Sequence, residues 1–442
     1  FKSSSDTETL LYSWAEWGKE SIKHFNGIFS FAVFDKQEDK LTIVRDKFGV
    51  KPLYIYQKDE TIAFSSEIKA LINIEGFDSA LNMEAIVNYL TFLWSPGSRT
   101  MYKHIKKLLP GSLVEVNTKT SDLNYVSVDN ESLFNGNYWD LSENEWIQKV
   151  DDALNRAVEN QMLSDAPLGF FLSGGLDSSL LVAIAKNQNE TQKFECFTID
   201  QYKGSKGDGF TDDLPYAKRV ADHLDISLNI IDSRFDWTDS FDNMIWHLDE
   251  PQADLAPINL MLISRYAKSL GIKVLIGGTG GDDVFSGYRR HQALLLNNSL
   301  EFIPKPFLKI LSKFIKHIPS SNNSMRRLKK ISRDWGQNKT NQILGFFNWL
   351  PSNQFFLKII SDQLLSKIQN YEPYSYGENL LSQNAEVSDL DQVLILEQNT
   401  FLIDHNLNYT DKLSMSEGVE VRVPYLDKDL IKLAGHIPQK FK

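Results

Sequence analysis

The sequence is poor in cysteine: its 442 residues include one, Cys196. One cysteine cannot form an intrachain disulfide, so the composition excludes a disulfide-stapled scaffold and favours a reducing compartment such as the cytoplasm. Cys196 lies in an expected strand, and we interpret it as a small buried residue rather than as a nucleophile.

The sequence also lacks long apolar runs and a basic excess. No apolar stretch approaches the roughly 20 residues that a membrane-spanning helix needs. Lys and Arg number 47 against 58 Asp and Glu, and the net charge of -11 argues against nucleic acid as a main partner, because phosphate backbones are bound through basic excess. A chain of 442 residues with 42% apolar and 24% charged residues is typical of a globular protein with at least two domains.

The first 120 residues have the pattern of a β-rich layered domain. Apolar stretches separated by polar turns predict strands at 27–34, 41–44, 52–56 and 112–116. Ser, Asn and Asp then become frequent, and we expect an exposed linker over 121–143.

From residue 144 onward the pattern changes to strands and helices in strict turn. We expect helices at 146–163, 178–187, 215–223 and 257–269, and short strands at 167–172, 194–199, 228–231 and 272–276. This alternation predicts a doubly wound α/β domain, in which helices cover both faces of a parallel sheet. Ligands of such domains bind beyond the carboxyl ends of the strands.

A phosphate-binding loop is expected where the first of these strands meets its helix. Residues 173–179 read Ser-Gly-Gly-Leu-Asp-Ser-Ser, without the Gly-Lys-Ser/Thr of the Walker pattern. The glycines let the backbone approach a phosphate chain, and the hydroxyls of Ser173, Ser178 and Ser179 with the helix N-terminus donate to its oxygens. Asp177 supplies a carboxylate for Mg²⁺. The segment resembles the pyrophosphate loop of ATP pyrophosphatases, which cleave ATP to AMP and pyrophosphate.

A second loop that also combines glycines with acidic residues follows the strand expected at 272–276. Residues 277–283 read Gly-Gly-Thr-Gly-Gly-Asp-Asp. Backbone donors and carboxylates again meet at a strand end, and Asp282 is the candidate for a second metal contact.

A basic helical insertion is expected at about 300–340. The lysines at 305, 309, 313 and 316 are spaced by four, four and three residues, with Phe307, Ile310, Leu311, Phe314 and Ile315 between them. This is an amphipathic pattern. A packed helix with a solvated lysine face is the favoured interpretation, and a helix that binds a membrane surface or an acidic partner is the alternative.

With both loops in place, the sequence resembles the glutamine-hydrolysing asparagine synthetase family over nearly all of its length. Beyond the two loops, the matching segments are 167–172, the Asp-Glu-Pro at 249–251, Asp254, the aromatic and glycine positions at 285–288, Ser414-Met415 and the Glu-Val-Arg-Val-Pro-Tyr-Leu-Asp at 420–427.

The resemblance implies an αββα sandwich of the N-terminal-nucleophile type for the glutaminase domain at 1–120, followed by the synthetase domain at 144–442. Asp6, in Ser5-Asp6-Thr7-Glu8, then holds the amino group of glutamine, and segments 45–54 and 64–67 are structural. The family's nucleophilic cysteine, and the arginine and Asn-Gly-Glu segment that grip glutamine, have no counterpart here. The chain begins at Phe1 and ends at Lys442, before the family's catalytic lysine, so we expect a fragment of a longer protein. A homodimer through the glutaminase domain is also implied.

The resemblance further implies that a carboxylate attacks the α-phosphate of ATP, and that ammonia from glutamine then displaces AMP. Under this reading Asp177, Asp282, Asp283 and Thr279 form the catalytic set, and Asp177 and Asp282 hold Mg²⁺. ATP and pyrophosphate contact Leu172, Ser173, Gly174, Gly175, Asp177, Ser178, Ser179, Ile199, Gly277 and Gly278.

One departure from the family bears on the substrate. Thr279 stands where the family has an acidic residue, and a hydroxyl cannot serve as a general base at neutral pH, although the adjacent Asp283 is a candidate substitute. The expected acceptor is L-aspartate, and the alternative is a uronic acid sugar of a surface polysaccharide. In the alternative, Arg289, Arg290 and His291 grip a nucleotide-sugar phosphate, unless they form a solvated loop. A non-catalytic nucleotide-binding relative is a weaker hypothesis, which Thr279 alone supports.

Overall fold

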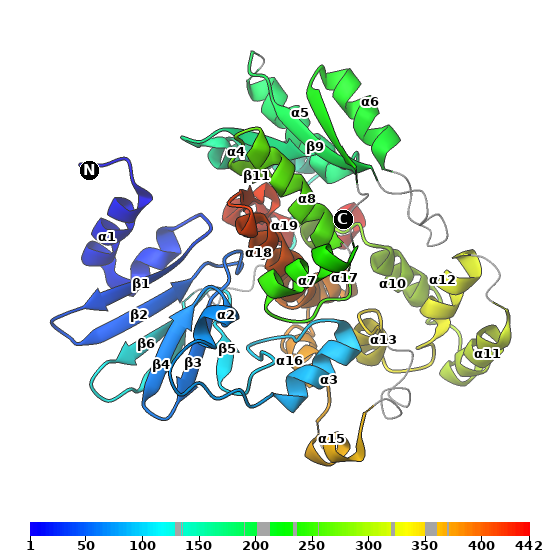
Figure 1. The fold of residues 1–442 in the computed structure, drawn as a ribbon. Helices are drawn as coiled ribbons and strands as arrows, with labels where there is room; N and C mark the ends of the chain where they lie inside the picture. The colour runs from blue at the N-terminus through cyan, green and yellow to red at the C-terminus, as the bar shows by residue number, and fades with distance from the viewer. Residues whose placement is uncertain are drawn as a thin grey trace. The chain divides into compact units, whose positions relative to one another are not determined.

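The computed structural model describes residues 1–128, 134, 136–189, 191–200, 213–232, 237–254, 256–319, 323–349, 360–368 and 371–442. The chain divides into two compact units (Figure 1). Unit 1 comprises Phe1–Asn82 and Gly97–Leu133, and unit 2 comprises Met83–Pro96 and Phe134–Lys442.

Unit 1 contains two antiparallel sheets. The first has the order β1-β2-β6-β7, and the second has the order β4-β3-β5. The strands are β1 Ser30–Asp35, β2 Lys40–Arg45, β3 Tyr54–Lys58, β4 Thr61–Ser65, β5 Ile105–Lys107, β6 Ser112–Asn117 and β7 Leu123–Ser127. The strands expected at 41–44, 52–56 and 112–116 are therefore confirmed, and the one expected at 27–34 begins later, at Ser30.

Side chains alternate between the faces of these strands, which fixes the layers of unit 1. Ile43 and Val114 point toward the second sheet, while their neighbours Val44 and Leu113 pack with Ile22 on the opposite face. The helices α1 Asp6–Trp17 and η1 Gly18–His24 cover that opposite face, and α2 Ile68–Leu71 covers the outer face of the second sheet. The order of layers is helix, sheet, sheet, helix.

Two segments differ from the sequence expectation. The expected linker at 121–143 includes β7, whose residue Leu123 packs in the inter-sheet core. Asn124, the polar residue between the apolar ones of β7, is exposed and donates to Glu115 of β6, so a strand was hidden in a polar composition. The helix α3 Met83–Phe92 lies in unit 2, where Val87 packs with Ile368.

The Arg45–Asp46 corner supports the structural interpretation of segment 45–54. The Arg45 guanidinium donates to the carbonyls of Gly49, Lys51 and Leu108. The buried Asp46 carboxylate accepts the N–H groups of Phe48, Val50 and Lys51. Both side chains therefore satisfy backbone groups of a buried turn.

Unit 2 is built on a parallel sheet with the order β10-β9-β8-β11-β12. Its strands are β8 Leu168–Phe171, β9 Glu195–Asp200, β10 Ser227–Asp232, β11 Val274–Ile276 and β12 Glu420–Arg422. The expected doubly wound sheet is confirmed, and the C-terminal β12 is a member that the alternation of strands and helices did not predict.

Helices cover both faces of this sheet. One face packs against α4 Glu143–Met162, α5 Leu176–Gln188, α6 Leu214–Leu224 and α19 Lys428–Gly435. On the other side lie α7 Trp237–Leu248, α8 Ala256–Ser269 and α18 Asn408–Ser416, joined by the apolar contacts of Met244, Ile258 and Leu413.

The remaining elements of unit 2 are helical. They are α9 Gly281–Phe285, α10 Arg289–Ser299, α11 Lys305–His317, α12 Asn323–Ser332, α13 Lys339–Gly345, α15 Asp362–Lys367, α16 Ser375–Gln383, α17 Asp389–Asn399, η3 Leu402–Leu407, η4 Pro424–Leu426 and η5 Gln439–Phe441. None of the helices in the described ranges is long and apolar enough to cross a membrane.

Candidate functional site

The two glycine loops follow neighbouring strands at the point where the sheet reverses its order. From β8 the chain moves outward to β9 and β10, and it then returns to place β11 on the other side of β8. In the β8–β11 pair, Phe170 lies opposite Ile276, so the loops that follow these strands leave the same edge of the sheet. This reversal is the position at which open α/β sheets bind ligands.

The first loop, 173–179, is held by its own serines. Ser178 Oγ accepts from the backbone N–H of Ser173 at 3.2 Å and lies 3.0 Å from Ser173 Oγ. Ser179 Oγ donates to the Gly175 carbonyl at 2.6 Å. The loop ends in α5, whose first residue, Leu176, is 81% exposed. The N-terminus of α5 and the hydroxyl of Ser173 therefore lie on an open side of the loop.

Gly174 is required by its backbone and by its neighbours. Its φ is +80°, a conformation that favours glycine. A Cβ at this position would also come closer than 3.0 Å to the backbone of Tyr216 and Ala217 in α6. The close approach of α6 therefore explains this member of the glycine pair.

The second loop packs directly on the first. A Cβ on Gly281 would come closer than 3.0 Å to the Asp177 carboxylate, and one on Gly278 would lie 3.1 Å from the Asp177 Cβ. Gly287 stands in the same relation to the Asp282 carboxylate. The glycines thus let the second loop lie against Asp177, and Asp177 and Asp282 come near enough to interact electrostatically.

Burial and mutual repulsion mark this carboxylate pair. Burial, with the charge of Asp282 added, raises the pKa of Asp177 to about 6. Burial likewise raises the pKa of Asp282. The described residues include no cluster of three or more His, Cys, Asp or Glu side chains suited to a metal ion. The protein itself thus offers two carboxylates, which is the donor set by which Mg²⁺ is held when substrate phosphates and water complete its shell.

The C-terminal signature at 420–427 supports both loops. β12 pairs with β11, and the pairing continues where the Gly277 N–H donates to the Arg422 carbonyl at 2.9 Å. The Tyr425 hydroxyl donates to the Asp177 carbonyl at 3.2 Å. The sequence showed this segment as a family signature, and the structure shows that Tyr425 fixes the backbone that carries Asp177.

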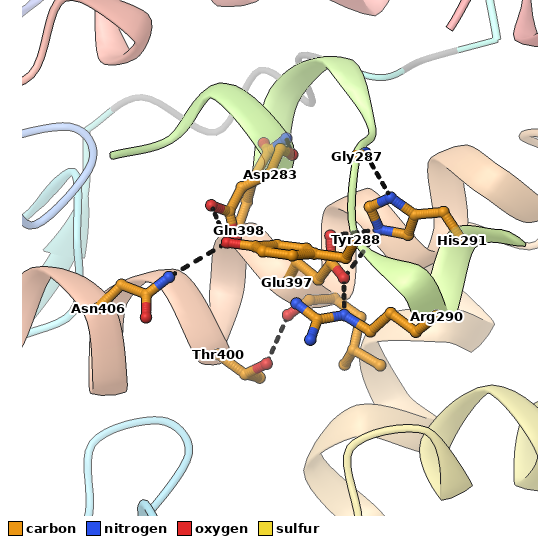
Figure 2. Close-up of polar contacts among 10 residues, drawn as sticks. Asp283, Gly287, Tyr288, Arg290, His291, Glu397, Gln398, Thr400 and Asn406 are labelled. Carbon is orange, nitrogen blue, oxygen red and sulfur yellow. Dashed lines mark hydrogen bonds and ion pairs between the residues drawn. The ribbon is translucent and has the colours of Figure 1, made fainter. Parts of the chain in front are cut away.

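Glu397 of α17 organises the start of α10 (Figure 2). Its fully buried carboxylate accepts from Arg290 Nε, and both of its oxygens lie 2.9 Å from His291 Nε2. The Gly287 N–H donates to His291 Nδ1 at 3.0 Å, so the imidazole carries its proton on Nε2 and donates it to Glu397. Both expectations are wrong for His291, which is buried and bonded to Glu397. Arg290 is paired with the same acid and is 18% exposed, while Arg289 is exposed at the first position of α10.

Asp283 joins the same network on the other side (Figure 2). Its carboxylate accepts from the Tyr288 hydroxyl at 3.1 Å, and its carbonyl accepts from the Gln398 amide at 2.8 Å. Asn406 donates to the Tyr288 oxygen at 3.3 Å. Burial raises the pKa of Asp283 to about 8, and the negative charge of Glu397 contributes. Asp283 is completely buried, so Asp282 is the acid of this pair that a ligand can reach.

The other expected site residues occupy three places. Leu172 and Ile199 lie at the carboxyl ends of the adjacent β8 and β9, where the Leu172 N–H donates to the Phe197 carbonyl at 2.9 Å. Thr279 is half-buried within the second loop. Asp6 is exposed at the first position of α1, which belongs to unit 1.

Sequence reasoning missed Tyr288, Glu397, Gln398 and Tyr425 as parts of the site. Two of them stand inside matched segments, at 285–288 and 420–427, and that was their only signal in the sequence. The interpretation of Cys196 is confirmed, since its side chain is completely buried and burial raises the pKa of its thiol to about 12.

Comparison with known proteins identifies both parts of the chain. The family model described as "Asparagine synthase" matches residues 149–442, and the model described as "Glutamine amidotransferase domain" matches residues 1–126. The protein named asparagine synthetase [glutamine-hydrolyzing] 1 of Bacillus subtilis is 28% identical over 449 residues, covering 100% of this chain and 67% of that protein. A putative asparagine synthetase [glutamine-hydrolyzing] 2 of Methanocaldococcus jannaschii is 29% identical, covering 72% of this chain and 58% of that protein.

A third relative has a different name. It is amidase chyE of Penicillium rubens, which is 28% identical, covering 67% of this chain and 45% of that protein. The chain spans about two thirds or less of the length of these relatives. Among solved structures, the glutamine-dependent NAD+ synthetase of Acinetobacter baumannii has a TM-score of 0.23 at 10% identity, covering 86% of this chain and 84% of that one, which is too weak to support a structural comparison. The asparagine synthase model covers more than half of the sequence, including both glycine loops, and the chain therefore belongs to the asparagine synthase family.

Proposed function

We propose that the protein is an ATP-dependent amide ligase that takes its nitrogen from glutamine. A substrate carboxylate attacks the α-phosphate of ATP, the bond between the α-phosphorus and the bridging oxygen breaks, and pyrophosphate leaves. Ammonia then attacks the acyl-adenylate, AMP leaves and an amide remains. The observation that carries the proposal is the meeting of Asp177 and Asp282 at the β8–β11 reversal, each on a glycine loop.

Each loop is assigned a part of the nucleotide. Ser173, Ser178 and Ser179, with the amides of Gly174 and Gly175, hold pyrophosphate at the N-terminus of α5. Leu172, Ile199, Gly277 and Gly278 line the AMP site at the carboxyl ends of β8, β9 and β11. This arrangement supports in-line separation of AMP from pyrophosphate at the sheet edge.

Asp177 and Asp282 are the residues that would hold Mg²⁺. Burial raises the pKa of both half-buried carboxylates, and the charge of Asp282 adds to the rise at Asp177, so a divalent cation bound between them would relieve an unfavourable accumulation of negative charge. Bound there, Mg²⁺ supplies neutralisation of the charge on the phosphates. Asp283 is assigned a positioning role behind Asp282, because its carboxylate is bonded to Tyr288 and is completely buried.

Unit 1 is assigned the role of a glutaminase domain of the N-terminal-nucleophile type. The helix, sheet, sheet, helix order of its layers and the amidotransferase match to residues 1–126 support this assignment. Asp6 at the exposed start of α1 is assigned to the glutamine amino group. Residence in the cytoplasm and a homodimer through this domain complete the proposal, on the strength of the family.

The proposed acceptor is L-aspartate, which the names of two relatives support. A specific observation favours a second candidate, the carboxylate of a uronic acid sugar. Thr279 stands in the second loop where an acid would orient ammonia, and the nearby Asp283 is buried and already bonded. An altered second loop is consistent with an altered acceptor.

Pyrophosphate release by the full-length protein tests the function and separates the two acceptors. The protein is supplied with ATP, Mg²⁺ and ammonia, and L-aspartate or a series of uronic acid sugars is added in turn. Release that requires aspartate establishes asparagine synthesis, and release that requires a sugar acid establishes the second candidate. Absence of release with every carboxylate, in a protein that still binds ATP, contradicts the ligase proposal.

A further inference from the structure

Helix α11 presents an apolar face to solvent. The favoured sequence interpretation required its apolar residues to pack, but only Leu308 and Ile315 are buried. The apolar side chains that point outward are Phe307, Ile310, Leu311 and Phe314, with exposed fractions of 65%, 52%, 45% and 69%. The interpretation of α11 as a packed helix is therefore wrong for most of its apolar face, because periodicity shows that a helix is amphipathic but not which side the fold covers.

The exposed residues form one stripe. Positions 307, 310, 311 and 314 are spaced as i, i+3, i+4 and i+7, which places them on one side of a helix with 3.6 residues per turn. The lysines at 305, 309, 313 and 316 are exposed on the opposite side of the helix. Leu308 and Ile315 hold α11 to the rest of unit 2, where it packs on α12 (Figure 1). Among the described residues, the fold thus packs on one narrow side of α11 and leaves the apolar stripe exposed.

Charge identifies the kind of partner. From residue 302 to residue 332 the sequence contains eight Lys and Arg residues and no Asp or Glu. The whole chain carries -11, so this segment is a strongly basic region on an acidic protein. The complementary surface is therefore anionic as well as able to receive phenylalanine side chains.

We propose that α11 binds the surface of an anionic lipid bilayer and lies in the plane of that surface. At such an interface the apolar stripe enters the boundary between headgroups and acyl chains, while lysines on the polar side remain among the phosphates. An acidic protein surface fits less well, because it would meet either the lysines or the apolar stripe and would leave the other in water. The proposal stands independently of the acceptor and of the amide chemistry.

Vesicle sedimentation with the full chain tests the proposal. The vesicles are an equimolar mixture of phosphatidylglycerol and phosphatidylcholine, compared with phosphatidylcholine alone at low and high salt. We expect binding to the anionic vesicles and weakening with salt. The variant F307N/F314N should bind at least about tenfold more weakly, because it removes two aromatic anchors from the stripe. Both side chains are exposed, so the fold does not depend on them.

Two further variants make the test specific. K313Q/K316Q should bind the anionic vesicles more weakly and with a shallower salt dependence. The matched control is I147N, which replaces a 60% exposed apolar residue on α4 and should bind like the parent. Equal binding to both vesicle types, or equal loss in I147N and F307N/F314N, would overturn the proposal. Binding to polyglutamate without binding to vesicles would also overturn it, in favour of an acidic protein partner.

Discussion

Replacing Glu397 with glutamine should destabilise unit 2 and disturb the site, because Glu397 holds the start of α10 just after the second loop. Its carboxylate is completely buried and accepts from Arg290 and His291. Glutamine has almost the same shape but carries no charge, so the guanidinium loses its counterion. Glutamine also has one acceptor oxygen in place of two. If that oxygen stays on Arg290, the amide nitrogen takes the other position and faces the His291 Nε2–H, which places two donors against each other.

The size of the effect follows from burial. Removing one partner of a buried ion pair costs about 3–5 kcal/mol, because the other charge is left unpaired. The Arg290 side chain is 18% exposed and stacks on the rings of Tyr288, Phe347 and Phe401, which keeps part of its stabilisation. We therefore expect a loss at the lower end of that range, about 3 kcal/mol.

Urea unfolding followed by tryptophan fluorescence measures this loss, and an exposed ion pair provides the control. Glu301, whose side chain is 62% exposed, pairs with Lys339 at 2.8 Å. The substitution Glu301→Gln should cost less than about 1 kcal/mol, because solvent screens exposed pairs. If Glu397→Gln unfolded like Glu301→Gln, the assignment of Glu397 as the buried anchor of α10 would be refuted.

A second readout links the same substitution to the site. His291 accepts from the Gly287 N–H, and Gly287 lies against the Asp282 carboxylate. If His291 turns its proton away from glutamine, it can no longer accept from Gly287. We therefore expect pyrophosphate release to fall in Glu397→Gln, and to remain at the parent level in Glu301→Gln.

The remaining predictions concern three other positions. Gly281→Ala should lower pyrophosphate release by up to about 100-fold while the protein stays folded, because its methyl group displaces the Asp177 carboxylate; unchanged release would show that the second loop does not rest on Asp177. Lys412→Met should cost about 3 kcal/mol in urea unfolding, because it removes the ammonium group that lies 2.7 Å from the Asp249 carboxylate, with both side chains 1% exposed. The double variant with Asp249→Asn should recover part of that loss. Cys196, whose thiol pKa is raised to about 12, should resist a disulfide reagent at pH 8 until urea unfolds the protein, and rapid reaction of the native protein would contradict its burial.

The periodic features of the chain were readable from its sequence. Amphipathic helices repeat with a period of 3.6 residues, and strands covered on both faces are short continuous apolar runs. The parallel sheet of unit 2 and its helices therefore follow from local pattern. The two glycine loops were readable because Asp177 and Asp282 stand beside glycines at strand ends, a combination that ordinary turns rarely use. The strand β12 could not be predicted in this way, because three residues are too few to show a pattern. The order of the strands in the sheet is also not encoded in local pattern.

The supporting residues could not be found by local pattern, because their partners are remote in sequence. Glu397 and His291 are separated by 106 positions, and Tyr425 and Asp177 by 248. Glu397 lies among the buried apolar residues of α17. From the residue type alone a glutamate is expected to be exposed to solvent. Its role becomes clear only when α10 and α17 are seen side by side in the structure. A buried acid is tolerated only when a charged or hydrogen-bonding partner lies beside it, and α10 supplies those partners.

The arrangement of buried charges suggests why the second loop needs so much support. Asp177 and Asp282 repel one another, and burial disfavours the charged form of each. Moving the loops apart would therefore lower the electrostatic free energy of the pair. Tyr425 on one side and the network of Glu397, Tyr288 and their partners on the other hold the backbone that carries the two acids. The stability of α10 and α17 thus opposes the repulsion at the sheet edge, and it keeps the two carboxylates close enough to share a ligand before that ligand binds.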